Sequence, residues 1–173
     1  QHSAYRMHME QAVFRMNDRR DVDMYDVSAL GEATAQGKWG HFTMGHRIQR
    51  NSLSGVHTAP RIAYTMVLGK AHFKAMWSKA FRIPTVMNLN YGPEGGDVTP
   101  ERITTTEAEV GLQLGAGTSI HGNVYHTRIN NPIVYVFDEA TLDNYVNRGL
   151  SGTEGVDARL LREQGKWIIQ AGL

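Results

Sequence analysis

The feature that most constrains the fold of this chain is an alternation of apolar and polar residues with a period of two. It is clear in the segment AHFKAMW, Ala71–Trp77, where every second residue is small or apolar and only Met76 interrupts the polar row. Successive side chains of a β-strand point to opposite faces, whereas those of a helix repeat about every 3.6 residues. The segment therefore predicts a strand with one apolar face and one wetter face.

The same pattern recurs along most of the chain and predicts about nine strands. They are expected at residues 5–14, 27–36, 39–50, 60–68, 71–82, 101–114, 118–127, 156–161 and 166–173, with a β-rich patch at 133–137 inside a longer loop. The charge-dense segment Asn17–Asp26 is typical of a solvated loop. Repeated strands of this kind build β-sandwiches, soluble barrels or membrane barrels.

The connections between these strands fall into two classes that alternate along the chain. Short turns are expected at Gly37, Gly69, Gly115 and Gly165, and longer loops around Asn17, Asn51, Thr85 and Asn131. Short turns and long loops would then lie at opposite ends of the strands, as in outer-membrane barrels. A lipocalin-like soluble barrel also alternates but turns its apolar face inward. Alternation by itself does not say which face is inside.

Composition limits the class of protein. With 173 residues and 41% hydrophobic content, the chain is long enough for one domain with a real core. Its 18 Lys and Arg and 17 Asp and Glu are dispersed, which gives no support to nucleic-acid binding. The longest apolar run, Ile62–Leu68, is far shorter than the roughly 20 residues of a membrane-spanning helix. The absence of cysteine excludes disulfides and thiolate metal sites.

The eight histidines do not form a metal-binding pattern along the sequence. His41 and His46 are five residues apart, as are His121 and His126, so each pair falls on opposite faces of its strand. No metal ligands are therefore predicted.

No catalytic residues are predicted either. Glu107 and Glu109 share a strand face, but no nucleophile motif accompanies them. The segment GPEGG, residues 92–96, lacks the Lys-Ser/Thr of a phosphate-binding loop and is expected to be an external loop. We expect a protein that is not an enzyme and needs no cofactor.

Four segments resemble a known family, and they occur in the order found in that family. FKAMWSKAFRIP, Phe73–Pro84, resembles the strand of TonB-dependent outer-membrane receptors that ends in Phe-Arg-x-Pro, and VTPERITTTEAEVGL, Val98–Leu112, resembles the strand after the next loop. The flank APRIAYTMVLGKAHFKA, residues 59–75, and YVNRGLSGTEGVDARL, Tyr145–Leu160, are also similar. The resemblance covers roughly residues 28–173.

The resemblance implies an all-β fold: part of an antiparallel transmembrane β-barrel, with about nine of about 22 strands. Residues 1–173 would all belong to one barrel domain, and the plug domain of the family is expected to be absent from this chain. The implied function is active transport of a scarce ligand across the outer membrane of a Gram-negative bacterium, energised through TonB. The ligand would be a siderophore, cobalamin, haem or a glycan-like molecule. The alternative is a passive porin-like barrel or a soluble β-sandwich or barrel that serves as a binding module.

The resemblance also implies partners. These are the TonB energy-coupling protein, acting through the missing plug region, outer-membrane lipid, a small-molecule ligand and, as a further candidate, a surface lipoprotein. Nucleic acid is not expected.

Residue roles follow from the same resemblance. The residues expected to face lipid are Phe73, Trp77, Val110, Leu112 and Leu160, and those expected to face the lumen are His72, Lys74, Glu107, Glu109 and Arg159. Trp39, Trp77 and Trp167 are expected in the interface girdles, and His46 and His126 near the external interface. External loops 85–97 and 130–147 would contact the ligand, through Asn88, Asn90, Tyr91 and Tyr135.

Overall fold

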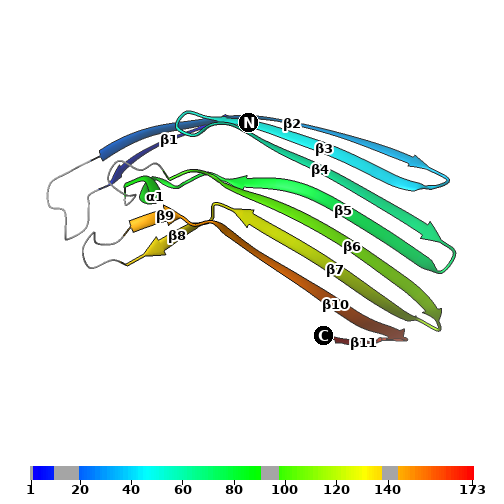
Figure 1. Cartoon of the computed structure of the whole chain (residues 1–173). Coiled ribbons are helices and arrows are strands. Elements are labelled where there is room, and N and C mark those ends of the chain that lie inside the picture. The colour runs from blue at the N-terminus through cyan, green and yellow to red at the C-terminus, as the bar shows by residue number, and fades with distance from the viewer. Residues whose placement is uncertain (1, 10–19, 91–97, 138–143) are drawn as a thin grey trace.

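A computed structural model describes residues 2–9, 20–90, 98–137 and 144–173 of the chain. Nine strands form one antiparallel sheet and follow one another in chain order (Figure 1). They are β1 (His2–Met9), β2 (Arg20–Gly37), β3 (Gly40–Asn51), β4 (Gly55–Leu68), β5 (Ala71–Arg82), β6 (Glu101–Gly115), β7 (Thr118–Asn130), β10 (Leu150–Gln164) and β11 (Trp167–Gly172). The predicted all-β, antiparallel, nine-stranded architecture is confirmed, with β1 and β11 at the two edges of the sheet.

Three short elements lie at one end of this sheet. They are the helix α1 (Val86–Asn90) and the strands β8 (Ile133–Val136) and β9 (Asn144–Asn147), which pair with each other in a separate two-stranded sheet. Figure 1 shows them at the end opposite the β4–β5, β6–β7 and β10–β11 turns. In the described part of the chain, no helix is long and apolar enough to cross a membrane.

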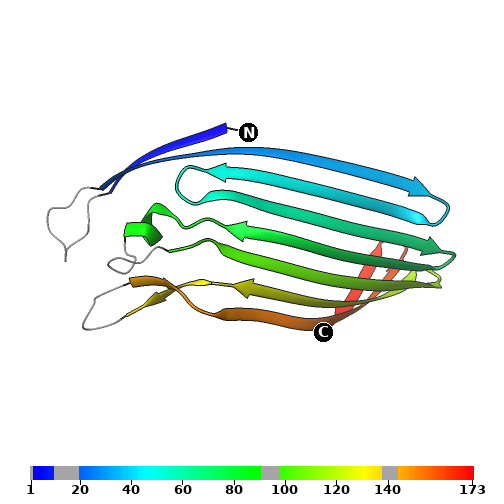
Figure 2. The ribbon, with the colours of Figure 1, turned by 45° about the horizontal axis from the view of Figure 1, so that its top comes forward.

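The sheet is a single curved layer (Figure 2), and its described residues form no apolar core of their own. Among the described residues, the buried hydrophobic side chains are Val86, Val98 and Ile133, and none of them belongs to the nine-stranded sheet. A soluble sandwich or lipocalin-like barrel would instead bury one face of each strand. The large apolar side chains of this sheet are therefore left on its surface.

Most of these exposed apolar side chains lie on one face, because residues paired on neighbouring strands point to the same side of the sheet; Leu30, Val67 and Ile168 are exceptions on the other face. Phe73 pairs with Val110, and Leu112 pairs with Ile120, which lies opposite Leu160. The register continues this apolar band through Phe42, Tyr64, Ala75, Ala108, Val124 and Val156. The next row toward the long-loop end contains Trp77, Thr106, His126 and Glu154, and the row after that Lys79, Thr104 and Arg128. The apolar band thus ends at a defined level along the strands.

The opposite face is mostly polar, and the greater shielding of its side chains indicates that it lies on the inside of the curve. Alternate residues of β6 and β7 on this face are less exposed than their neighbours, as the burial patterns of both strands show. Two hollows, of about 560 and 430 Å³, open on this face. Side chains converge on the concave side of a curved sheet, which explains why polar residues here are more shielded than the apolar residues on the outside.

The structure corrects two predicted loops. The connection around Asn51 was expected to be long, but β3 and β4 are joined by residues 52–54 alone. Asn51 is fully buried; its Oδ1 accepts hydrogen bonds from the backbone N–H groups of Leu53 and Ser54 at 2.9 and 2.8 Å, and its Nδ2 donates to Asp26 at 2.9 Å. This side chain closes a tight turn that the polar composition alone did not distinguish from a loop.

The second correction concerns the predicted loop at residues 17–26. Strand β2 already begins at Arg20 and pairs with β1 from there. Its charged residues extend beyond the level of the apolar band, where neither face needs to be apolar and the strand is held by backbone hydrogen bonds. Charge density is a poor guide to the end of a strand in such a sheet. Residues 10–14 of the first predicted strand lie outside the described residues.

Candidate functional site: the long-loop rim and the polar face

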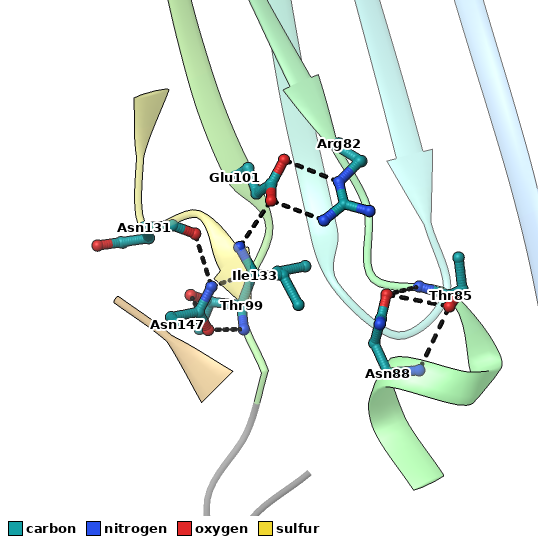
Figure 3. Close-up of polar contacts among 8 residues, drawn as sticks. All are labelled: Arg82, Thr85, Asn88, Thr99, Glu101, Asn131, Ile133 and Asn147. Atoms are coloured by element: carbon teal, nitrogen blue, oxygen red, sulfur yellow. Dashed lines mark hydrogen bonds and ion pairs between the residues drawn. The ribbon is translucent and has the colours of Figure 1, made fainter. Parts of the chain in front are cut away.

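An ion pair joins the ends of two central strands at the rim. Arg82, the last residue of β5, and Glu101, the first of β6, are directly paired in the sheet. Arg82 donates two hydrogen bonds of 2.7 Å, from Nε and Nη2, to the two carboxylate oxygens of Glu101 (Figure 3). Two parallel hydrogen bonds fix both the distance between the two side chains and the orientation of the guanidinium relative to the carboxylate. It closes the base of the long connection that contains α1.

Glu101 also holds the hairpin formed by β8 and β9. Its side chain is only 9% exposed, and its Oε1 accepts a 2.6 Å hydrogen bond from the backbone N–H of Ile133 (Figure 3). One carboxylate therefore couples the β5–β6 connection to the β7–β10 connection. The residue next to Glu101, Arg102, is exposed on the outer face beyond the apolar band, so this group lies past the end of that band along the strands.

The charge state of Glu101 is set by these contacts. The hydrogen bonds from Arg82 are the largest influence and hold the pKa of the Glu101 carboxyl below its ordinary value, with a further contribution from the Ile133 N–H. Burial acts in the opposite direction but does not prevail. The same contact raises the pKa of Arg82. Both groups are therefore charged at neutral pH.

Asn147 reinforces the rim from the end of β9. Its Oδ1 accepts a 2.7 Å hydrogen bond from the backbone N–H of Thr99, and its Nδ2 donates to the carbonyl oxygens of Thr99 and Asn131 at 2.9 and 2.7 Å (Figure 3). Asn131 itself has a positive φ of 54°, a conformation that Asn tolerates better than most residues. Three segments that are distant in sequence are thus tied together at this edge.

Helix α1 is capped by a reciprocal pair of side chains. Oδ1 of Asn88 accepts hydrogen bonds from the backbone N and the Oγ1 of Thr85, each at 3.0 Å, and the backbone N of Asn88 donates to Thr85 Oγ1 at 3.3 Å (Figure 3). This is the arrangement of a capping box, with Asn in the position usually taken by Glu or Gln. Asn88 is 6% exposed, so its amide oxygen is engaged within the rim.

Three of the four predicted ligand contacts, Asn88, Asn90 and Tyr135, belong to this end of the sheet. Asn88 is part of the cap, and Asn90 is the last residue of α1. Tyr135 is exposed, and its ring lies edge-on to that of Tyr145 across the β8–β9 hairpin, with centroids 5.5 Å apart. Tyr91 lies outside the described residues. The roles of these residues in ligand binding remain predictions.

A groove of about 560 Å³ lies just below the rim on the polar face. Its walls include Asp26, Arg47, Gln49, Phe81 and Arg82. Gln49 is buried, accepts a hydrogen bond from Arg47 at 2.5 Å and donates one to Asp26 at 2.9 Å. The groove thus combines fixed charges of both signs with an aromatic ring, a lining suited to a polar ligand or to another segment of protein.

Farther along the strands, the polar face carries charged side chains in rows across β5, β6 and β7. Lys74 Nζ lies 4.0 Å from Glu107 Oε1, and His72 Nε2 lies 2.8 Å from Glu109 Oε1. The five residues predicted to face the lumen are on this face: His72, Lys74, Glu107, Glu109 and Arg159. The five predicted to face lipid are on the other: Phe73, Trp77, Val110, Leu112 and Leu160. What each face contacts stays a prediction.

Sequence reasoning missed the groupings that depend on pairing between strands. His72 and His121 flank Gly111 on adjacent strands, with ring centroids 5.3 Å apart. The spacing of histidines along one strand does not reveal which of them face each other across neighbouring strands. Gly111 was the available signal, because a glycine inside a strand marks a place where other groups approach the backbone closely.

A family of known proteins matches nearly the whole chain. Residues 10–172 match the family model described as TonB dependent receptor-like, beta-barrel. The search of curated proteins gave no match.

Solved structures share the fold at low sequence identity. The siderophore receptor PirA from Pseudomonas aeruginosa superposes with a TM-score of 0.73 at 15% identity over 87% of this chain and 35% of its own. A mutant of the ferric enterobactin receptor PfeA from Pseudomonas aeruginosa gives 0.72 at 13% identity, over 91% and 27%. The copper transporter OprC gives 0.68 at 15% identity, over 90% and 30%. The chain thus spans about a third or less of the length of these proteins.

Proposed function

Because the chain belongs to the family of TonB-dependent receptor-like β-barrels, we propose that it forms part of the wall of an outer-membrane transporter that imports a scarce ligand. The observation that carries this proposal is the division of the sheet into an exposed apolar outer face and a polar inner face. In the described chain, the large hydrophobic side chains of the sheet are not buried in a protein core. A lipid-facing barrel wall is the arrangement in which that exposure is favourable.

The positions of tryptophans agree with a barrel that crosses a bilayer. Trp39 and Trp167 lie beside the β2–β3 and β10–β11 turns and are 71% and 68% exposed. Trp77 lies at the other border of the apolar band, in the row of Thr106 and His126. Aromatic girdles at the two interfaces flank the apolar band of outer-membrane barrels. Lipid would then contact Phe73, Val110 and Leu160, while His72 and Glu107 line the lumen.

We propose that transport is energised through TonB, acting on a plug domain, and that the ligand is a metal chelate of the ferric siderophore class. Support comes from the relatives, two of which are named as a siderophore receptor and a ferric enterobactin receptor and one as a copper transporter. The contacts that the sequence predicts are of mixed character: Asn88 and Asn90 of α1, Tyr91, and Tyr135 of β8. These residues would contact the ligand from outside, before it reaches the groove lined by Arg47 and Phe81.

Uptake of radiolabelled ferric siderophore by cells that carry the intact protein tests this function. We expect accumulation that requires both this protein and TonB and that is abolished in an otherwise identical strain without TonB. Accumulation that continues without TonB would instead indicate a passive porin-like barrel. TonB-dependent uptake of copper but not of iron chelates, in the same strains, would support energised transport but would show that the ligand is not a ferric siderophore.

A further inference from the structure

Three side chains with metal-ligating atoms meet on the polar face, one from each of three adjacent strands. They are His72 of β5, Glu109 of β6 and His121 of β7, and one ligand atom from each, an imidazole nitrogen or a carboxylate oxygen, lies within 4.8 Å of the other two. All three are half-buried. We propose that these residues bind a divalent first-row transition cation on the inner face of the barrel wall.

Gly111 makes the convergence possible. It lies between His72 and His121 in the sheet, paired with each of them. A Cβ atom at this position would lie 1.9 Å from Cε1 of His72, so the imidazole occupies the space that any other residue would need. The His72 ring lies over the glycine, and the ring centroids of His72 and His121 are 5.3 Å apart at an interplanar angle of 50°. The glycine thus forms the floor of the site.

The hydrogen bonding of His121 leaves one ring nitrogen available to a cation. Its Nε2 lies 3.1 Å from Oγ of Ser119, whereas its Nδ1 is shielded from solvent and has no hydrogen-bond partner among the described residues. A histidine that ligates a metal usually binds with one nitrogen while the other donates a hydrogen bond that orients the ring. With Ser119 as acceptor, the lone pair of Nδ1 can bind the cation.

Glu109 and His72 complete the set of ligands. Their side chains already share a 2.8 Å contact between Nε2 and Oε1. Two imidazoles and one carboxylate form a ligand set that binds Zn²⁺ with a fourth position open, and Cu²⁺ binds such ligands more tightly. Ligand atoms held at about 2 Å from one ion lie about 3.3 Å apart, so small side-chain rotations close the site. The cation would take the place of the hydrogen between Nε2 of His72 and Oε1 of Glu109, and the neutral imidazole would then carry its proton on Nδ1.

The surrounding charges leave room for a cation. Lys74 is paired with Glu109 in the sheet, and its Nζ lies 4.0 Å from Oε1 of Glu107, the neighbouring carboxylate on the same face of β6. A groove of about 430 Å³ runs beside the site, and its lining contains Asp157 and Arg159 as well as Glu109 and His121. Because the groove carries charges of both signs, it provides access without a strong positive barrier.

The test is a titration of the intact protein in detergent with Cu²⁺, followed by calorimetry and by electron paramagnetic resonance. The decisive variants are His121→Ala, which removes a ligand, and Gly111→Ala, which keeps all three ligands but forces the His72 ring out of its place. We expect both to lose one bound equivalent of Cu²⁺ or to weaken its binding at least about tenfold. The spectrum of the wild-type protein should show nitrogen coupling from imidazole, reduced in both variants.

The matched control is His126→Ala. His126 also lies on β7 and faces a carboxylate, with Nδ1 3.4 Å from Oε2 of Glu154, but it is on the outer face and has no third ligand in the described chain. Its removal should leave Cu²⁺ binding unchanged. Unchanged binding in both Gly111→Ala and His121→Ala would overturn the proposal. Since metal binding is measured directly, this result is independent of whether transport requires TonB.

Discussion

Arg82 and Glu101 face each other at the final paired position of β5 and β6 and are joined by two parallel hydrogen bonds of 2.7 Å. The same carboxylate accepts the backbone N–H of Ile133, so one buried side chain ties together two long connections at the rim. Removing the Glu101 carboxylate should therefore loosen both the β5–β6 connection and the β7–β10 connection.

Replacing Glu101 with Gln should loosen the β8–β9 hairpin. The charge-assisted bonds to Arg82 are lost, and the amide cannot reproduce the contact to Ile133 at full strength, which should cost about 2 kcal/mol of local stability. Hydrogen exchange of the amides of Ile133–Val136 in the intact protein measures this directly. Glu154→Gln is the control, because Glu154 is 84% exposed and its removal should leave exchange unchanged. Equal protection in Glu101→Gln and wild type would contradict the coupling.

The same contact predicts how the hairpin responds to acid. The pKa of Glu101 is lowered in the folded rim, so its stabilising contribution is complete above the ordinary pKa of a glutamate, about 4.3, and is lost as the pH falls through the lower folded value. Exchange of Ile133, corrected for the intrinsic pH dependence of amides, should therefore accelerate only below about pH 4.3. The Glu101→Gln variant should show no such transition. An onset near neutral pH would mean that another group controls the hairpin.

Thr85→Ala and Asn88→Ala should have similar effects on ligand affinity. Each change breaks the cap of α1, at a cost of about 1 kcal/mol, and Asn88 is too buried to offer its amide oxygen elsewhere without leaving the cap. Binding of the transported chelate to intact protein by calorimetry compares the two. A much larger loss for Asn88→Ala would show that this residue contacts the ligand directly, as the sequence predicts.

Phe73→Lys should impair assembly of the intact protein in the outer membrane. Phe73 lies within the apolar band of the outer face, opposite Val110, where a lysine costs about 2–4 kcal/mol at the middle of a bilayer. The control is Met76→Lys, on the inner face and paired with Glu107, which should be tolerated. The amount of heat-modifiable protein in purified outer membranes distinguishes the two variants. Equal assembly of both would show that the outer face does not meet lipid.

The strand content and the sorting of side chains by face could be predicted from sequence because both depend on neighbours in the chain. Around Phe73, apolar and polar residues alternate with a period of two, so they fall on opposite faces of the strand regardless of which strand pairs with it. Strand ends were less predictable. The turn after Asn51 is short because of hydrogen bonds from its side chain, and β2 begins at Arg20 because its charged residues lie beyond the apolar band.

By itself, the sequence determined that this chain forms antiparallel strands with one apolar and one polar face, and its motifs identified the family. The curvature of the sheet decided which face is inside, and strand pairing decided which residues meet. His72, Glu109 and His121 belong to three different strands, and Arg82, Glu101 and Ile133 come together only when two long connections fold over the rim. Alternation is a local property of the backbone, whereas register and curvature depend on long-range pairing, which is why the clusters became visible only in the tertiary structure.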